Sequence, residues 1–230
     1  MLLGSLDLLT DDPAAFVRLA VVVAFSLIVA ITIHEFSHAL VASGLGDNTA
    51  KRLGRLSLNP VRHMDRSGTV MMLVAGFGWG KPVPVNEGRL RYGRQGVGLV
   101  AAAGPLANLF TALFVGSVLV VAALRGADVH SIGFAAARII ISISIILTAF
   151  NFLPIPPLDG FSALLGILPP GLAEQLERLR QFGPGILMAA FALNFLLPIN
   201  LFWTVMSPIV AIIYRLLAMW ERILGAALLP

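Results

Sequence analysis

One long apolar helix with ionisable residues inside it sets the strongest limit on how this chain can fold. The helix is predicted to run from about Ala14 to Ser43, because Asp12 and Pro13 suit the N-cap and the first helical position. Its stretch from Leu19 to Leu45 is long enough to cross a bilayer. The second half of this apolar run contains the sequence HEFSH, and a charged group at that depth is normally functional.

Composition extends the membrane interpretation to the whole chain. Of its 230 residues, 58% are hydrophobic and only 12% are charged, whereas a soluble domain has about 25% charged residues. A soluble core could not hide so much apolar surface, so we expect a multi-pass membrane protein. No secretory signal is recognisable, and we expect the first span to be retained. Cysteine is absent, which excludes disulfides and thiolate metal sites.

Further apolar segments predict an all-α polytopic fold. After the first span (14–43), a second is expected at 97–124 and a third at 132–153, which form a three-helix core within residues 1–168. An amphipathic stretch follows at 169–183, and residues 169–230 complete the chain. From Pro184 onwards the pattern fits either one span plus an interfacial helix or two short spans.

The loop between the first two spans is strongly basic. Between Val41 and Gly96 the chain carries nine of its 16 Lys and Arg residues and three acids. The positive-inside rule places residues 46–96 in the cytoplasm and the N-terminus outside, and it explains the charge better than nucleic-acid binding does. The nine basic residues are Lys51, Arg52, Arg55, Arg62, Arg66, Lys81, Arg89, Arg91 and Arg94.

Two segments of this loop are unusual. Residues Gly68 to Gly80 are apolar but too short to span, which suggests a small re-entrant or membrane-associated element. The next five residues are Lys81, Pro82, Val83, Pro84 and Val85, in which proline alternates with valine. Proline within a sheet is confined to edge positions, so we expect an edge strand there.

The HEFSH sequence has the spacing of a zinc site. His34 and His38 lie four residues apart and share one face of a helix, so both imidazoles can bind a single Zn²⁺. Glu35 lies beside them and can accept a proton from water. In a chain with so few histidines and glutamates, chance gives only about 0.0015 matches to H-E-x-x-H. The alternative is a pair of interfacial histidines with a snorkelling glutamate, which their depth disfavours.

A catalytic zinc site needs a third protein ligand. The candidates are His63, His130 and Asp159. At helical rise the third span brings residue 151, and the Asp159 segment after it, to about 28 Å below the outer surface, and the histidine pair lies at about 26 Å on the same count. Asp159 therefore reaches the level of the histidines, although it could also be the N-cap of a helix from Gly160 to Leu168.

These motifs together resemble the site-2 protease family of intramembrane zinc metalloproteases. The resemblance rests on HEFSH, on GPLAN (104–108) and on NFLPIPPLDG (151–160), with support from SLNPVRHMD (57–65) and GWGKPVPVN (78–86), and it covers roughly residues 20 to 165. The chain departs from the family at Arg66, where proline is common. It also lacks the PDZ and CBS domains of some members, so it resembles a minimal form.

The resemblance implies one Zn²⁺ per chain, held by His34, His38 and Asp159, with Glu35 as general base and acid. Asn151 and Asn108 would contact the substrate carbonyl or the oxyanion, although Asn108 could instead be an interhelical hydrogen-bonding group. His63 and Asp65 are interpreted as a loop-structuring pair rather than as catalytic residues.

We therefore expect an endopeptidase that cuts within or near transmembrane helices of membrane proteins. The 81–85 edge would pair with an unwound substrate segment, and zinc would activate the attacking water. Two other functions are weighed: an inactive relative that binds membrane proteins, and a metal transporter. A bacterial inner membrane is the expected location, and the sequence gives no oligomeric state.

Overall fold

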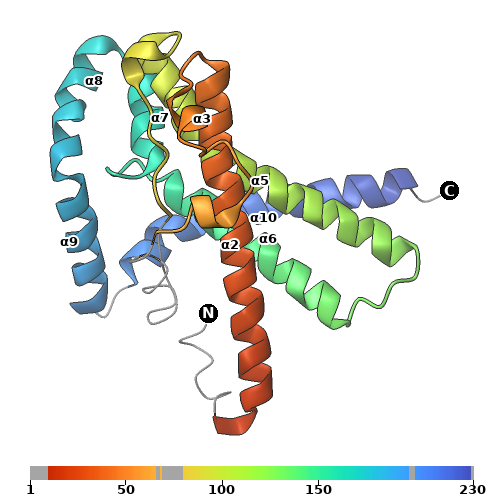
Figure 1. Ribbon diagram of the computed structural model, residues 1–230. Helices are drawn as coiled ribbons and strands as arrows, with labels where there is room; N and C mark the ends of the chain where they lie inside the picture. The colour runs from red at the N-terminus through yellow and green to blue at the C-terminus, as the bar shows by residue number, and fades with distance from the viewer. Residues whose placement is uncertain (1–9, 66–67, 69–79, 197–199, 229–230) are drawn as a thin grey trace.

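The computed structural model describes residues 10–65, 68, 80–196 and 200–228, and helices dominate this part of the chain (Figure 1). Four helices are long and apolar enough to cross a membrane: α2 (Pro13–Gly44), α5 (Gly93–Leu124), α6 (Ile132–Asn151) and α10 (Leu201–Leu228). The protein is therefore an all-α polytopic membrane protein, as its composition predicts.

Shorter helices connect and flank these four. They are α3 (Thr49–Arg52), η2 (Pro60–Arg62), η3 (Glu87–Arg89), α7 (Asp159–Ile167), α8 (Pro170–Glu177), η4 (Arg178–Phe182) and α9 (Gly183–Leu196). With 14 residues α9 falls short of the roughly 20 that a span requires. Beyond Pro184, α10 is the one helix of the described region that is long enough, so the C-terminal part contributes one span and a shorter helix.

The ends of α2 follow local signals in the sequence. The Asp12 side chain accepts a hydrogen bond from the backbone N–H of Ala15 at 2.9 Å, and Pro13 occupies the first turn. At the other end the helix stops at Gly44, and Gly46 adopts a left-handed φ of +107°. The predicted cap is confirmed, and the predicted bounds agree to within one residue.

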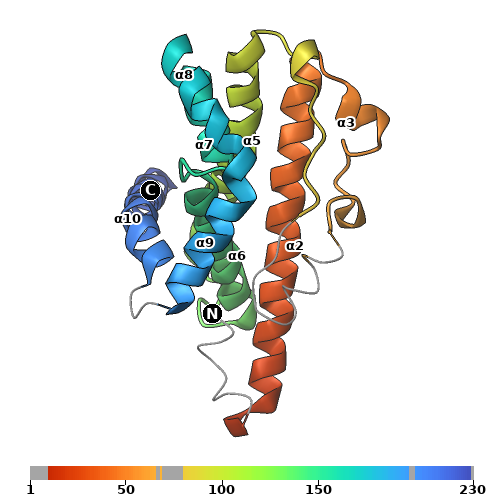
Figure 2. The same ribbon diagram turned by 90° about the vertical axis from the view of Figure 1, so that its left-hand side faces the viewer.

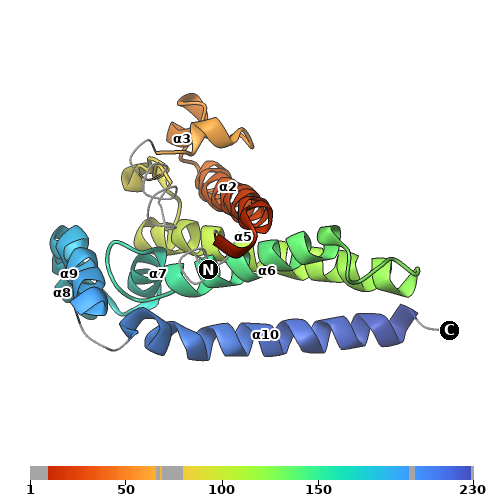
Figure 3. The same ribbon diagram turned by 90° about the horizontal axis from the view of Figure 1, so that it is seen from below.

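The long helices form three layers. Seen from below, α2 lies on one side of the α5–α6 pair and α10 on the other (Figure 3). The view turned by 90° about the vertical axis gives the same order of α2, the α5–α6 pair and α10 (Figure 2). Between α5, α6 and α10 the buried core contains Ala112, Ile141, Ile145, Met206 and Val210. Its burial fixes α10 against the outer face of the pair.

The outward faces of the long helices are also apolar. Val21 and Phe25 on α2 are 62% and 58% exposed, and Phe110 and Phe114 on α5 are 67% and 70% exposed. Large exposed apolar surfaces are rare on soluble monomers, whereas a surface in contact with lipid tails is expected to be apolar. The exposed phenylalanines therefore fit helices that face lipid.

A pair of glycines brings α7 against α5. A Cβ atom added at Gly98 would lie 2.9 Å from the Cα of Gly166, and one added at Gly166 would lie 2.8 Å from the Cα of Gly98. The two backbones can approach this closely only because neither residue has a side chain. This contact matters for function because α7 begins with Asp159.

The loop segment at residues 80–86, called the extended segment below, runs beside α2 (Figure 1). Sequence analysis predicted an edge strand at 81–85, and here the described residues form no strand: the single bridge is the antiparallel pair Met64 and Gly80. The two prolines explain the difference, because they remove the N–H groups that a ladder needs. Most of the predicted re-entrant element lies outside the described residues.

We predict that Gly98→Ala lowers the melting temperature of the detergent-purified protein, since the added methyl group meets the backbone of α7. Overpacking of this kind costs about 1–3 kcal/mol. Gly185→Ala is the matched control, because a Cβ at this helical glycine has nothing within 4 Å. Thermal unfolding followed by intrinsic fluorescence measures both, and equal melting temperatures for the two variants would contradict the role given to Gly98.

Candidate metal centre

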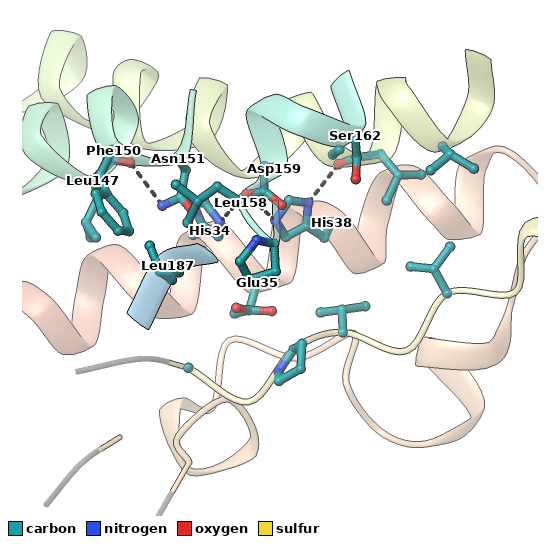
Figure 4. Close-up of a pocket in the computed structure, with 18 of the residues that line it drawn as sticks. His34, Glu35, His38, Leu147, Phe150, Asn151, Leu158, Asp159, Ser162 and Leu187 are labelled. Atoms are coloured by element: carbon teal, nitrogen blue, oxygen red, sulfur yellow. Dashed lines mark hydrogen bonds and ion pairs between the residues drawn. The ribbon is translucent and has the colours of Figure 1, made fainter. Parts of the chain in front are cut away.

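Two histidines of α2 face the interior of the helix assembly. His34 and His38 lie one turn apart and are 8% and 7% exposed, with their ring centroids 4.7 Å apart. Glu35, next to His34, is half-buried and points toward the extended segment (Figure 4). The HEFSH helix thus presents its imidazoles on one face and its carboxylate on an adjacent one.

The third ionisable group comes from α7. Asp159 Oδ2 lies 2.9 Å from His34 Nε2 and 3.3 Å from His38 Nε2 (Figure 4). Asp159 is the first residue of α7, whose N-cap is Leu158, and its carboxylate makes no capping hydrogen bond. The interpretation of Asp159 as a helix cap is therefore wrong, and its carboxylate is turned to the histidines instead.

The turn that delivers Asp159 depends on the glycine that follows it. A Cβ atom added at Gly160 would lie 2.4 Å from the backbone carbonyl carbon and oxygen of Phe152. The chain leaves α6 at Asn151 and folds back on itself tightly enough that only glycine fits. This contact gives a physical reason for glycine in the LDG sequence.

The three side chains form a set of ligands that suits zinc. Among the described residues, His34, His38 and Asp159 are the one group of three or more potential ligands whose donor atoms converge, all within 4.8 Å of one another. Ligands at about 2.1 Å from a tetrahedral zinc ion lie roughly 3.4 Å apart, close to the spacing of Asp159 from the histidines. Two imidazoles and one carboxylate also match catalytic zinc sites, which keep a fourth position open.

The ring nitrogens that face away from Asp159 have partners too. His38 Nδ1 lies 2.7 Å from the carbonyl oxygen of Val100, to which it donates a hydrogen bond. This contact places the proton on Nδ1 and leaves Nε2 as the free ligand atom. A backbone carbonyl on α5 thereby fixes the orientation of one candidate ligand.

His34 uses the amide of Asn108 in the same way. The Asn108 side chain is fully buried, and its Nδ2 lies 3.2 Å from His34 Nδ1, while its Oδ1 has no hydrogen-bond partner. Oxygen and nitrogen of an amide are nearly identical in shape, so their assignment must follow the hydrogen bonds. A ligating His34 carries its proton on Nδ1, which requires the Asn108 oxygen to face the ring. Asn108 then accepts a hydrogen bond and its orphaned oxygen is satisfied.

A glycine on α5 makes room for both imidazoles. A Cβ atom added at Gly104 would lie 2.5 Å from His38 Nε2 and 2.6 Å from His34 Nε2. Any side chain there would fill the space in which the ligand atoms converge. In the sequence Gly104 is the first residue of GPLAN, and a small residue in a membrane helix is expected to serve helix packing. Its spacing of four from Asn108, on the same helix face, was the available signal.

A cavity of about 730 Å³ opens beside the three ligands (Figure 4). Asn151 lines it, as do Pro82, Val83 and Val85 of the extended segment, whereas the buried Asn108 does not. Arg180 of η4 and Leu187 of α9 also line it. The volume falls in the usual range of ligand sites, about 300–1,000 Å³.

The other candidate ligands lie elsewhere. His63 is fully buried in the basic loop, where its Nε2–H donates to the carbonyl of Ser57 at 2.6 Å. Burial and the charge of Arg55 lower the pKa of His63, although the Ser57 contact opposes this. Asp65 accepts a hydrogen bond from the backbone of Gly68, and His130 is exposed in the α5–α6 loop. His63 and Asp65 therefore each bind a backbone group of their own loop.

Comparison with known proteins identifies relatives that share most of this length. "Putative zinc metalloprotease YwhC" of Bacillus subtilis is 39% identical over 171 residues, which cover 72% of this chain and 78% of that protein. "Putative zinc metalloprotease Rip2" of Mycobacterium tuberculosis strain H37Rv is 31% identical, covering 79% and 71%. Its namesake in Mycolicibacterium smegmatis is 28% identical, covering 76% and 68%. No family model and no solved structure matches the chain.

We predict that Asn108→Leu weakens zinc binding by about 10- to 100-fold, the usual cost of removing an outer partner of a ligating histidine. Asn108→Asp should bind zinc more tightly than the leucine variant, because a carboxylate can also accept from His34 Nδ1–H. Competition with a chromogenic chelator measures the affinity of each variant. If the leucine variant bound zinc as tightly as the wild type, Asn108 would have no influence on the ligand.

Proposed function

Because the chain belongs to the zinc metalloprotease family that includes YwhC and Rip2, we propose that it is an intramembrane endopeptidase of the site-2 protease type. It would hydrolyse peptide bonds within or near the transmembrane helices of membrane proteins. The side chains of His34, His38 and Asp159 would hold one Zn²⁺.

One observation carries this proposal: the ligand atoms converge inside the helix assembly rather than at its end. His34 and His38 lie ten and six residues before the last residue of α2, Gly44, which is about 9–15 Å along the helix axis. They open onto a cavity rather than onto packed side chains. Ionisable groups at such depth in an apolar span mark function, and a water-filled cavity is the condition under which they are tolerated.

Glu35 would move the protons. Zinc at this position supplies Lewis acidity, which makes water a nucleophile near neutral pH and polarises a carbonyl. The Oε2 atom of Glu35 is buried and has no hydrogen-bond partner among the described residues, although Glu35 lines the cavity. This oxygen is free to take a proton from the attacking water and to return it to the leaving amine.

Asn151 would stabilise the developing oxyanion. Its Nδ2 donates one hydrogen to the carbonyl of Leu147 at 3.0 Å, which holds the amide in place. The same nitrogen has a second hydrogen, and Asn151 lines the cavity beside the ligands. A preorganised donor of this kind contributes about 2.7–4 kcal/mol where one has been removed from other enzymes.

The extended segment would hold the unwound substrate. Within the described residues, the backbone of Val83, Pro84 and Val85 takes part in no backbone–backbone hydrogen bond. Val83 and Val85 line the cavity, and the Val83 N–H interacts with the Glu35 carboxylate. A substrate strand added along this edge would bring its scissile bond next to Glu35.

The partners follow from this mechanism. The substrates would be single-span membrane proteins with a helix that unwinds locally, and no nucleic acid is involved. Residues 46–96 would lie in the cytoplasm and the N-terminus outside, because the basic residues gather in that loop. A bacterial inner membrane is the proposed location.

We predict that Glu35→Gln binds one zinc per chain but loses cleavage, since the amide retains the shape of the side chain and cannot accept the proton. Asp159→Ala should lose both, because a ligand is missing. Metal content of the detergent-purified protein and cleavage of a synthetic single-span peptide, with Asn-Pro-Gly inserted in its apolar segment, measure the two properties. A Glu35→Gln protein that still cuts would refute the general-base role.

The same measurements separate the alternatives. A folded wild type without metal would favour an inactive relative that binds membrane proteins. Zinc uptake into vesicles without cleavage would favour a transporter, although the described residues gather one converging ligand group rather than a series along a path.

We further predict that Val85→Pro lowers kcat/KM for this peptide about tenfold or more, because it removes the backbone N–H of Val85, which could donate to the substrate strand. Val85→Ala should have a smaller effect. Alanine retains the N–H group and removes only side-chain packing. Equal activity of the two variants would count against backbone pairing at this edge.

A further inference from the structure

Arg55 is the cation of the basic loop that the positive-inside rule explains least. Arg55 is only 6% exposed, whereas Lys51 and Arg52 of the same loop are exposed. A charge that merely marks the cytoplasmic side of a membrane has no reason to be buried, because burial removes its hydration.

The guanidinium of Arg55 binds the extended segment. Its Nη2 donates to the carbonyl oxygen of Lys81 and, at 3.0 Å, to that of Pro82. No carboxylate forms an ion pair with Arg55 among the described residues. The charge of Arg55 is thus compensated by backbone carbonyls, at the point where the segment passes Glu35.

The two ends of the segment are fixed as well. The Lys81 N–H donates to the carbonyl of His63 at 2.7 Å, and the Asn86 N–H donates to Asp47 Oδ2 at 2.6 Å. Burial alone would raise the pKa of Asp47, but hydrogen bonds from Thr49 and Asn86 outweigh it and hold the pKa below its usual value. Asp47 is therefore a stable anchor at neutral pH.

The position that these bonds fix lies very close to Glu35. A Cβ atom added at Gly80 would lie 3.1 Å from Glu35 Oε1 and 2.9 Å from Ile31 Cγ2. At Gly80, the first residue of the extended segment, the backbone is therefore packed directly against α2. Arg55 binds the two residues that come directly after Gly80 and before Val83.

We propose that Arg55 is a positioning residue that holds the extended segment at a fixed distance from Glu35, so that the backbone of Val83 to Val85, which makes no backbone–backbone hydrogen bond within the described residues, is presented to the substrate. This proposal rests on the proposed proteolytic function. In it Arg55 acts only through the segment and touches neither the substrate nor the metal.

The activity test compares Arg55→Met with Arg52→Met, an exposed arginine three residues away in the same loop. Arg55→Met should lower kcat for the synthetic single-span peptide by about 10- to 100-fold, the loss expected for hydrogen bonds from a charged donor. Zinc content should stay at the wild-type value. Arg55→Lys should recover part of kcat, because an ammonium group can still donate to a carbonyl.

A second measurement needs no substrate. The chain has no cysteine, so spin labels can be placed at Lys81→Cys, on the segment, and at Ile167→Cys, an 82% exposed position on α7. The distance distribution between them should be narrow in the otherwise wild-type chain and with Arg52→Met, and clearly broader with Arg55→Met.

The outcomes are distinguishable from those of the proposed function. If the wild type cuts no peptide but Arg55→Met broadens the spin-label distance distribution, the proposed proteolysis is refuted, whereas the role of Arg55 in holding the extended segment is supported. If the wild type cuts and Arg55→Met matches Arg52→Met in kcat and in distance, the positioning role is overturned. Loss of zinc in Arg55→Met would also overturn it, since Arg55 would then support the metal centre rather than the segment.

Discussion

The contact on which the rest of the structure depends is that of two buried imidazoles with one carboxylate. His34 and His38 lie in an apolar helix, where an unpartnered polar group is costly. Their Nε2 atoms meet Asp159, and their Nδ1 atoms are held by Asn108 and by the carbonyl of Val100. All four ring nitrogens thus require groups from α5 or α7, which explains why those helices must approach α2 so closely and why Gly104 faces the rings.

Sequence predicted the parts of this arrangement that hydropathy and spacing control. The apolar runs predicted α2, α5 and α6, whereas the number of spans after Pro184 was left open, and the spacing of four in HEFSH put both imidazoles on one face of α2. Counting helical rise from the membrane surface brought Asp159 to their level, and the structure places all three side chains together. These features are local or one-dimensional, so a single sequence is enough to predict them.

The remaining features could not be predicted, because the groups involved cannot be recognised from the type of residue in the sequence. The group that fixes His38 is a backbone carbonyl, and every residue has one. Gly104 and Gly98 matter because they have no side chain, which leaves room for close neighbours. Small residues are common in membrane helices for packing alone, so their presence does not mark these two positions. Arg55 could not be singled out from the sequence, because the membrane topology explained it as one of nine basic residues in a loop. Its burial distinguishes it from the other basic residues of this loop that the structure describes.

If the extended segment pairs with a substrate, as proposed, it has to meet two requirements that usually conflict. A segment that pairs with a substrate must leave backbone groups unbonded, yet unbonded backbone near a membrane tends either to form a ladder with its own loop or to lose its position. Pro82 and Pro84 prevent the first outcome because they have no N–H to donate. Arg55, His63 and Asp47 would prevent the second, because they bind the start and the end of the segment. Among the described residues, Val83 to Val85 are left without a backbone–backbone hydrogen bond. The position of the segment is thus fixed by contacts outside Val83 to Val85. A buried arginine is suited to this role because its guanidinium has only donors, so it binds carbonyl oxygens and does not occupy the N–H groups of the segment.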